Sequence, residues 1–371
     1  MFQREVAPGI TFVEGERRGR FPFGNVLVLS SPRRGAGEAR VLVDTGAGED
    51  VLTAILAAGS VDLVINTHYH IDHVRGNGLF GGASAPGGPG APGGAGTPGG
   101  AGTPSAPGGA SAPGTPGGTR AVFWCPEGES GPISTWEGFL EFTGFGRPGF
   151  DEARLFRKAL GWTPTPIARE LRDGEVLDLG GRGGLEVVVL RLPGHTPGHT
   201  GLWFPSERVI FSADIDLSGF GPWYGDVYGS IDDFLTSIRR LDNLVDQASA
   251  RGRHPVTIIA SHRRPMEYDD FKGRLPRFVA HVAARDERIL GILAAGGPLT
   301  LERVVDEWPI YGPQASPLPG VRKSEYFMVK HHLERLARAG RVVVETDAAG
   351  TEGLGGNAGD ESGGKKLWRV P

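Results

Sequence analysis

The feature that most constrains this chain is a run of the form His-x-His-x-Asp-His at residues 68–73, directly after the apolar residues 61–65. The apolar residues predict a buried strand, so the polar run begins where the strand ends. Alternate side chains of an extended backbone point the same way, so His68 and His70 can bind one ion together. Asp72 and His73 lie in the turn that follows and can face a second ion. Imidazole and carboxylate donors without a thiolate suit zinc, iron or manganese.

Four further Asp or His residues also follow apolar runs that predict strands. They are Asp44 after residues 41–43, His195 after 187–192, Asp214 after 209–211 and His262 after 257–260. All five motifs therefore place candidate ligands at the end of a predicted strand.

Taken in this order, the five motifs resemble those of the metallo-β-lactamase superfamily. The resemblance covers roughly residues 10–270, with one insertion, and it implies an α/β fold, the αββα metallo-β-lactamase sandwich. It further implies which residues bind metal. One ion is expected on His68, His70 and His195, the other on Asp72, His73 and His262, and Asp214 is expected to bridge them.

Three other residues near these motifs are interpreted through the same resemblance. Asp44 is expected to orient metal-binding groups, because partners of this kind fix the tautomer and basicity of a ligand. In the Gly/Pro-rich run at residues 193–199 the family pattern uses the first histidine, so His199 is interpreted as structural. A ligand role for His199 is the alternative. Asp216, two residues after Asp214, is a candidate neighbour of the site.

The resemblance implies two bound zinc ions, with iron or manganese as alternatives. Two cations roughly 3.5–4 Å apart lower the pKa of a shared water towards neutrality, which gives a metal-bound hydroxide at physiological pH. Asp72 and Asp214 are the candidate catalytic carboxylates. We expect hydrolysis of an ester, thioester or related small-molecule bond. The alternative is a single-strand-specific endoribonuclease, and an oxygenase with one iron is a further alternative.

Length and composition limit the remaining possibilities. A chain of 371 residues favours two domains, which we place at residues 1–270 and 275–371. A single cysteine excludes a disulfide scaffold and is compatible with a reducing cytosol. No apolar run of about 18 residues is present, so neither a signal peptide nor a membrane span is expected, and the predicted location is cytoplasmic.

Residues 81–119 contain only Gly, Ala, Ser, Pro and Thr. No such segment can build a core, so it is predicted to be a disordered or extended insertion without a role in the chemistry. A Gly-rich stretch at residues 347–364 predicts a flexible hairpin tip.

Two groups of aromatic residues are candidates for contact with substrate. Five of them, in a Gly-rich stretch, either cover the metal cleft or pack as a helix on the sandwich: Trp136, Phe139, Phe142, Phe145 and Phe150. Trp223 and Tyr224, on a Gly/Pro-rich loop after Asp214, are predicted to form a substrate wall.

The last hundred residues predict helices over about 281–293, 299–308 and 326–339, followed by two strands, an order that resembles a winged helix. Residues 271–341 hold 12 Lys and Arg against 7 Asp and Glu, whereas the whole chain has a net charge of −4. Single-stranded RNA is therefore a candidate partner, with Arg322, Lys323 and Lys330 as candidate contacts. Winged helices also mediate packing, so a homodimer is a further expectation. Because the chain is net acidic, a small-molecule substrate ranks ahead of RNA.

Overall fold

The computed structural model describes residues 2–32, 38–81, 121–147, 150, 157, 161–179, 184–250, 255–315, 320–346 and 365–371. The predicted insertion, Gly81 apart, and the predicted hairpin tip lie outside the described residues. The residues on either side of the insertion lie next to each other, because the amide of Ala121 donates a hydrogen bond of 3.1 Å to the carbonyl oxygen of Phe80.

The first sheet has seven strands in chain order, antiparallel from β1 to β4 and parallel from β4 to β7. The strands are β1 (Gln3–Ala7), β2 (Ile10–Val13), β3 (Val26–Pro32), β4 (Glu38–Val43), β5 (Leu63–Ile65), β6 (Val122–Pro126) and β7 (Arg169–Leu171). Because β4 and β5 are parallel, with Val41 opposite Leu63, the residues that follow both strands emerge at the same edge.

The second sheet has six strands in the order β13-β12-β11-β10-β9-β8. They are β8 (Val176–Leu179), β9 (Leu185–Arg191), β10 (Thr200–Phe204), β11 (Val209–Phe211), β12 (Thr257–Ala260) and β13 (Arg263–Glu267). The parallel pair β11 and β12, with Ile210 opposite Ile258, again brings the residues after two strands to one edge.

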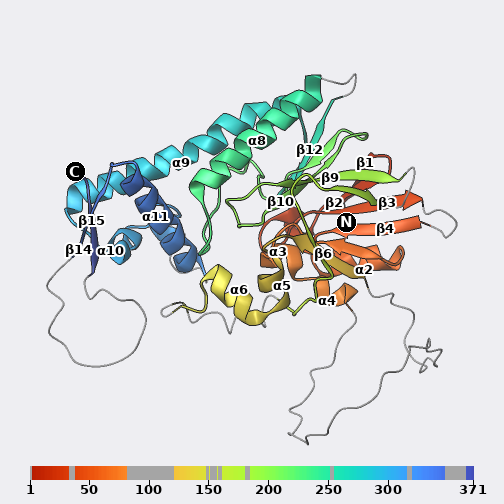
Figure 1. The fold of residues 1–371 in the computed structure, drawn as a ribbon, viewed down its shortest axis with the longest axis horizontal. Coiled ribbons are helices and arrows are strands. Elements are labelled where there is room, and N and C mark those ends of the chain that lie inside the picture. The colour runs from red at the N-terminus through yellow and green to blue at the C-terminus, as the bar shows by residue number, and fades with distance from the viewer. Residues whose placement is uncertain are drawn as a thin grey trace, which may run out of the picture.

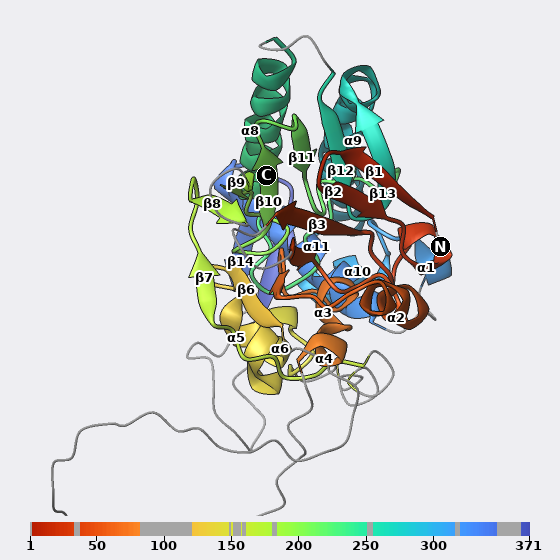
Figure 2. The same cartoon turned by 90° about the vertical axis from the view of Figure 1, so that its right-hand side faces the viewer.

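The two sheets pack face to face around a buried apolar core that includes Phe12 and Leu27 from the first sheet and Phe204 and Phe211 from the second. Helix α2 (Glu49–Ala57) covers the outer face of the first sheet. Helices α8 (Ile231–Ala250) and α9 (Tyr268–Gly296) cover the outer face of the second (Figures 1 and 2). The prediction of a mixed α/β fold with two packed sheets is confirmed.

Short helices surround the edge where the predicted ligands lie. They are α1 (Glu16–Gly19), α3 (Ile71–Val74), α4 (Asn77–Phe80), α5 (Ser130–Ser134) and α6 (Trp136–Thr143). Helix α6 begins at an N-cap, Thr135, whose side chain accepts a hydrogen bond from Gly138 N, and it ends at Gly144 in the left-handed conformation.

The C-terminal part contains the rest of α9, then α10 (Leu301–Asp306), the short 3₁₀ helix η1 (Pro313–Ala315), α11 (Val321–Arg338) and the antiparallel pair β14 (Val343–Thr346) and β15 (Lys366–Arg369). Thr300 caps the N-terminus of α10, since its side chain accepts from Arg303 N. The element order agrees with the predicted helices and strands, whereas the assignment to the winged-helix fold stays a prediction.

Helix α9 begins earlier than the sequence pattern indicates, at Tyr268, and continues through Pro276 without an interruption. It therefore runs through the predicted boundary between the two domains, and that division stays a prediction. Across the described residues, none of the helices combines the length and apolarity that crossing a membrane requires.

Candidate metal centre

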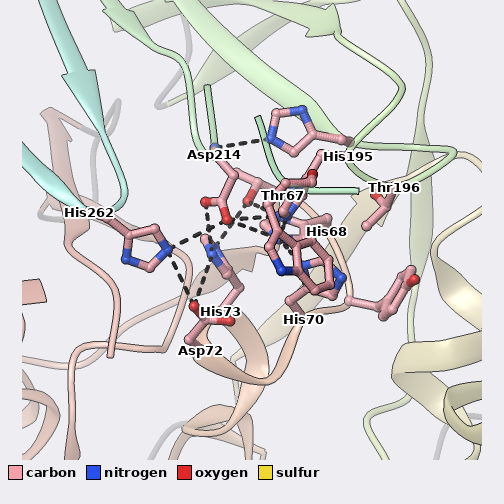
Figure 3. Close-up of polar contacts among 12 residues, drawn as sticks. Thr67, His68, His70, Asp72, His73, His195, Thr196, Asp214 and His262 are labelled. Atoms are coloured by element: carbon pink, nitrogen blue, oxygen red, sulfur yellow. Dashed lines mark hydrogen bonds and ion pairs between the residues drawn. The ribbon is translucent and has the colours of Figure 1, made fainter. Parts of the chain in front are cut away.

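The seven predicted ligands meet at the edge of the sandwich where their strands end (Figure 3). They form two groups, and the donor atoms within each group lie within 4.8 Å of one another. The first group is His68, His70, His195 and Asp214, and the second is Asp72, His73 and His262. The grouping corresponds to the two sets that the family resemblance implies, and the role of these residues as metal ligands stays a prediction.

In the first group the imidazole nitrogens converge on one point. His68 Nε2 lies 3.0 Å from His70 Nδ1 and 3.2 Å from His195 Nε2. Asp214 Oδ2 lies 3.1 Å from His195 Nε2 and 3.9 Å from His68 Nε2. Four donor atoms of this kind around one point match the nitrogen and oxygen ligands of a divalent cation.

In the second group Asp72 Oδ2 lies 3.3 Å from His262 Nε2 and 4.0 Å from His73 Nε2. Asp214 also faces this group, because its Oδ1 lies 3.1 Å from His73 Nε2 and its Oδ2 lies 3.5 Å from His262 Nε2. One carboxylate thus points an oxygen at each group, which is the arrangement expected of a bridging ligand.

Hydrogen bonds fix the orientation of the candidate ligands from outside. Asp44, which adopts a left-handed φ of 62° directly after β4, accepts from His73 Nδ1 at 2.8 Å and from Thr67 N at 2.7 Å. His195 Nδ1 donates to the carbonyl oxygen of Trp223 at 2.8 Å, and His262 Nδ1 donates to that of Gly19 at 2.7 Å. In each histidine the nitrogen left over points into the site.

The two residues with open roles, His199 and Asp216, lie close to the site. His199 Nδ1 donates to Leu192 O at 2.9 Å and its Nε2 accepts from the backbone amide of Asp214 at 3.0 Å. Both nitrogens are thus engaged, which supports a structural role that holds Asp214 in place. Asp216 lines the cavity described below and its carboxylate accepts from Ser218 N at 2.9 Å.

The charges of the site's titratable groups depend strongly on one another. Burial opposes charge on Asp72, but His73 and His262 outweigh it and lower the pKa of the carboxyl to about 2. Burial likewise opposes protonation of His73, yet the carboxylates of Asp214, Asp44 and Asp72 raise its pKa to about 10. Burial lowers the pKa of His68 well below its usual range, and the neighbouring His73 adds to this.

Two buried polar atoms of the site have no hydrogen-bond partner among the described residues, and this indicates that the donor set fits a metal ion. They are His73 Nε2 and Asp214 Oδ1, which face each other at 3.1 Å. A buried polar atom without a partner is costly, and a cation between them satisfies both. The residues present therefore fit a bound divalent cation.

Sequence reasoning missed one buried polar network behind His70. Asp226 Oδ2 accepts from His70 Nε2 at 2.8 Å and from Tyr69 OH at 2.7 Å, and the other oxygen accepts from Lys323 of α11. Lys323 also donates to Gly225 O at 2.9 Å. The one sequence signal for this network is that Asp226 lies on the aromatic loop after Asp214. Its partner Lys323 is distant in sequence and reaches it only in the folded chain.

A cavity of about 410 Å³ opens onto the two ligand groups. His70, Asp72, His195, Asp214 and His262 lie on its wall together with largely apolar side chains, which are Phe21, Ile71, Phe139, Phe145, Phe220, Trp223, Tyr311 and Val321. The C-terminal part of the chain supplies Tyr311, Val321 and Lys323, so the cavity is formed by both predicted domains.

Some of the candidate aromatic residues line the cavity, whereas others pack against neighbouring elements. Phe139 and Phe145 line the cavity, while Phe139 also packs in a buried cluster with Trp136 of α6. Trp223 lines the cavity and its indole donates to Tyr311 OH at 2.6 Å. Tyr224 is not among the lining residues, because it is buried on the other side and its hydroxyl lies 2.7 Å from His332 Nε2.

The three cations predicted to contact RNA all have carboxylate partners. Lys323 is buried beside Asp226, with only 3% of its side chain exposed. Arg322 pairs with Asp306 at 2.8 Å and Lys330 with Glu334 at 2.6 Å. Neither RNA binding nor a homodimer gains support from these contacts.

Comparison with known proteins agrees with this geometry. The family described as "Metallo-beta-lactamase superfamily" matches residues 20–262. The acyl-coenzyme A thioesterase MBLAC2 of Gallus gallus is 31% identical over 121 residues, which is 32% of this chain and 40% of that protein. Its human counterpart is 32% identical over the same length. The chain thus spans about 40% of the length of the curated relatives that it matches.

Two solved structures resemble the whole chain. A beta-lactamase domain protein from Burkholderia ambifaria has a TM-score of 0.61 at 18% identity, covering 100% of this chain and 93% of its own. A metallo-beta-lactamase family protein from Thermus thermophilus has a TM-score of 0.58 at 21% identity, covering 98% of this chain and 100% of its own. At these identities the likeness shows the fold. The chain belongs to the metallo-β-lactamase superfamily of metal-dependent hydrolases.

Proposed function

We propose that this protein hydrolyses thioesters or related esters of small molecules that carry an apolar acyl group. The observation that carries the proposal is the position of the His/Asp cluster on the wall of a largely apolar cavity of about 410 Å³. Cavities of roughly 300–1,000 Å³ hold ligands of small-molecule size.

The seven ligands divide into two metal sites under this proposal, with Asp214 shared between them. Imidazole and carboxylate donors suit zinc, iron and manganese. Zinc is the metal that the family resemblance favours, and iron or manganese are alternatives. When bound, two divalent cations lower the pKa of a coordinated water towards neutrality and polarise a substrate carbonyl.

The chain's own residues orient the acyl group. The Trp223 ring lies 5.0 Å from the His70 ring and 5.3 Å from the His195 ring, centroid to centroid, so an apolar wall stands directly beside the first ligand group. Phe220 packs against Tyr311 with ring centroids 4.9 Å apart and extends this wall towards the C-terminal part. An acyl chain packed along these rings presents its carbonyl to the ligands.

Similarity to a thioesterase supports the choice of bond. The relative named acyl-coenzyme A thioesterase aligns with about a third of this chain, and its name states that it hydrolyses an acyl thioester. Cleavage of RNA is disfavoured by charge, because Lys323 is the one Lys or Arg among the described residues of the cavity wall and Asp226 neutralises it.

The test is a parallel assay of an acyl-thioester panel and a labelled single-stranded RNA. Three proteins are compared: the wild type, His70→Ala, and Asp178→Asn as a control with an exposed carboxylate on β8. The proposal expects thioester turnover in the wild type and the control and its loss in His70→Ala. Cleavage of RNA alone, lost in His70→Ala, would reverse the assignment.

A further inference from the structure

A turn beside the second ligand group carries three exposed arginines. Helix α1 and the residue after it contain Arg17, Arg18 and Arg20, and all three side chains are exposed. The backbone is held in the left-handed region at Arg17 (φ 49°), Arg18 (φ 63°) and Gly19 (φ 66°). Left-handed conformations are costly for residues with a side chain, and they persist where the surroundings fix them.

Asn25 is the residue that fixes the turn. Its Oδ1 accepts from Gly15 N at 3.1 Å, and its Nδ2 donates to Arg263 O at 3.0 Å. A Cβ at position 19 would lie 2.2 Å from Asn25 Oδ1, so only glycine fits there. The turn is thereby anchored to the start of β13, next to a candidate metal ligand.

The turn lies next to the cavity and to the second ligand group. The carbonyl oxygen of Gly19 accepts from His262 Nδ1 at 2.7 Å, so the residues on either side of Gly19 flank the second ligand group. Phe21, next to Arg20, lines the cavity and is 67% exposed, which marks the rim.

None of these three guanidinium groups has a carboxylate partner among the described residues. Within the described residues, Arg17, Arg18 and Arg20 make neither a side-chain hydrogen bond nor an ion pair, and Arg17 only lies over the Phe23 ring. The nearby carboxylate of Glu14 is already bound by Arg264 through two hydrogen bonds of 2.7 and 3.1 Å.

Several exposed arginines elsewhere in the described part of the chain pair with carboxylates, although Arg172 and Arg277 do not. Examples are Arg240 with Asp173, Arg274 with Asp270, Arg338 with Asp232 and Arg341 with Glu287. A cluster of three guanidiniums without carboxylate partners on a fixed turn is therefore a candidate for binding an anion.

We propose that the turn at residues 16–20 binds the anionic end of the substrate's leaving group while the acyl end occupies the cavity. The inference rests on the proposed function and names its substrate class: an acyl thioester of a thiol that carries phosphates or carboxylates. In the reaction, a water oxygen bonds to the acyl carbon, the carbon–sulfur bond breaks, and the sulfur leaves as the thiol with a proton. The arginines bind the departing thiol and take no part in bond cleavage.

The test compares three thioesters with one acyl group in common. The thiols are coenzyme A, which carries phosphates, glutathione, which carries carboxylates, and N-acetylcysteamine, which is uncharged. The variant Arg17→Gln/Arg18→Gln/Arg20→Gln is compared with the wild type and with the control Arg239→Gln/Arg274→Gln/Arg277→Gln, which removes as many exposed charges from α8 and α9.

We expect the kcat/KM of the preferred anionic thioester, relative to that of the neutral one, to fall by roughly fivefold to a hundredfold in the first variant at low salt. The control should keep the wild-type ratio. Loss confined to the coenzyme A arm assigns phosphates, and loss confined to the glutathione arm assigns carboxylates. An unchanged ratio in both arms overturns the inference.

Calorimetry with free coenzyme A and free glutathione separates this inference from the proposed function. If the wild type hydrolyses none of the thioesters, the proposed function fails. Binding of either thiol that is lost only in the first variant would then still support the anion site, and equal binding by all three proteins would overturn it.

Discussion

Replacing Lys323 by Met should destabilise the protein far more than a substitution on a helix normally does. The ammonium of Lys323 and the carboxylate of Asp226 form an ion pair in which the side chains are 3% and 1% exposed. Removing one partner leaves the other charge buried, and such a loss costs roughly 3–5 kcal/mol. With that cost, the midpoint of thermal unfolding falls by roughly 5–15 °C.

Two companion variants give the prediction its controls. Lys330→Met, on the same helix, breaks a partly exposed pair with Glu334 and should cost less than about 1 kcal/mol. The double variant Lys323→Met/Asp226→Asn removes both charges, so it should be more stable than Lys323→Met alone.

Denaturant unfolding followed by circular dichroism measures these differences on the metal-free protein. A second readout is the metal affinity of the double variant. Asp226 also accepts from His70 Nε2, and loss of a hydrogen-bond partner of a metal ligand weakens metal binding roughly tenfold to a hundredfold. The reasoning is refuted if Lys323→Met unfolds within about 1 kcal/mol of the wild type, or if the double variant is no more stable than the single one.

Three further predictions concern the metals, the acid limit of stability and the insertion. Purified wild-type protein should hold close to two metal equivalents by elemental analysis and Asp214→Ala clearly fewer, since Asp214 faces both groups; equal content would remove the bridging role. Burial lowers the pKa of His332, so its neutral form stabilises the fold above about pH 6.5 and this stability is lost as the pH falls. Unfolding from about pH 8 to about pH 5 should show that loss, and His332→Gln should flatten it; parallel curves would contradict the assignment. Replacing residues 81–119 by a short Gly/Ser linker should leave kcat within about threefold, because the free energy of closing a loop depends weakly on its length. Loss of activity in a folded variant would assign the segment a role.

The candidate site could be predicted because each ligand follows an apolar run. A strand end fixes the direction of the next few side chains, and parallel strands bring their ends to one edge, as β4 with β5 and β11 with β12 do here. The family resemblance therefore named seven residues that the fold brings together, while their role as metal ligands stays a prediction.

The partners of these ligands could not be predicted in the same way. Lys323 meets Asp226 across a separation of 97 residues, and Asn25 Nδ2 meets Arg263 O across 238. No periodicity links such positions, because they come together only when α11 and β13 pack. Lys323 was accordingly predicted to be a surface cation, whereas the fold buries it.

The early part of α9 was missed for a different reason. Pro276 lies inside the helix, where a proline removes one backbone donor and is a signal for a helix end. Burial of Phe271, Leu275 and Phe278 against the second sheet outweighs that signal. Tertiary packing decided the boundary.

The continuity of α9 also has a consequence for how the chain unfolds. Phe271, Phe278 and Val282 belong to the core under the second sheet, while Ile289 and Leu293 belong to the core shared with α11. One helix is thus part of both cores, and neither can lose it without exposing buried apolar surface. The two parts of the chain are therefore expected to unfold cooperatively in a single transition, and a truncation at residue 275 removes core from the sandwich itself.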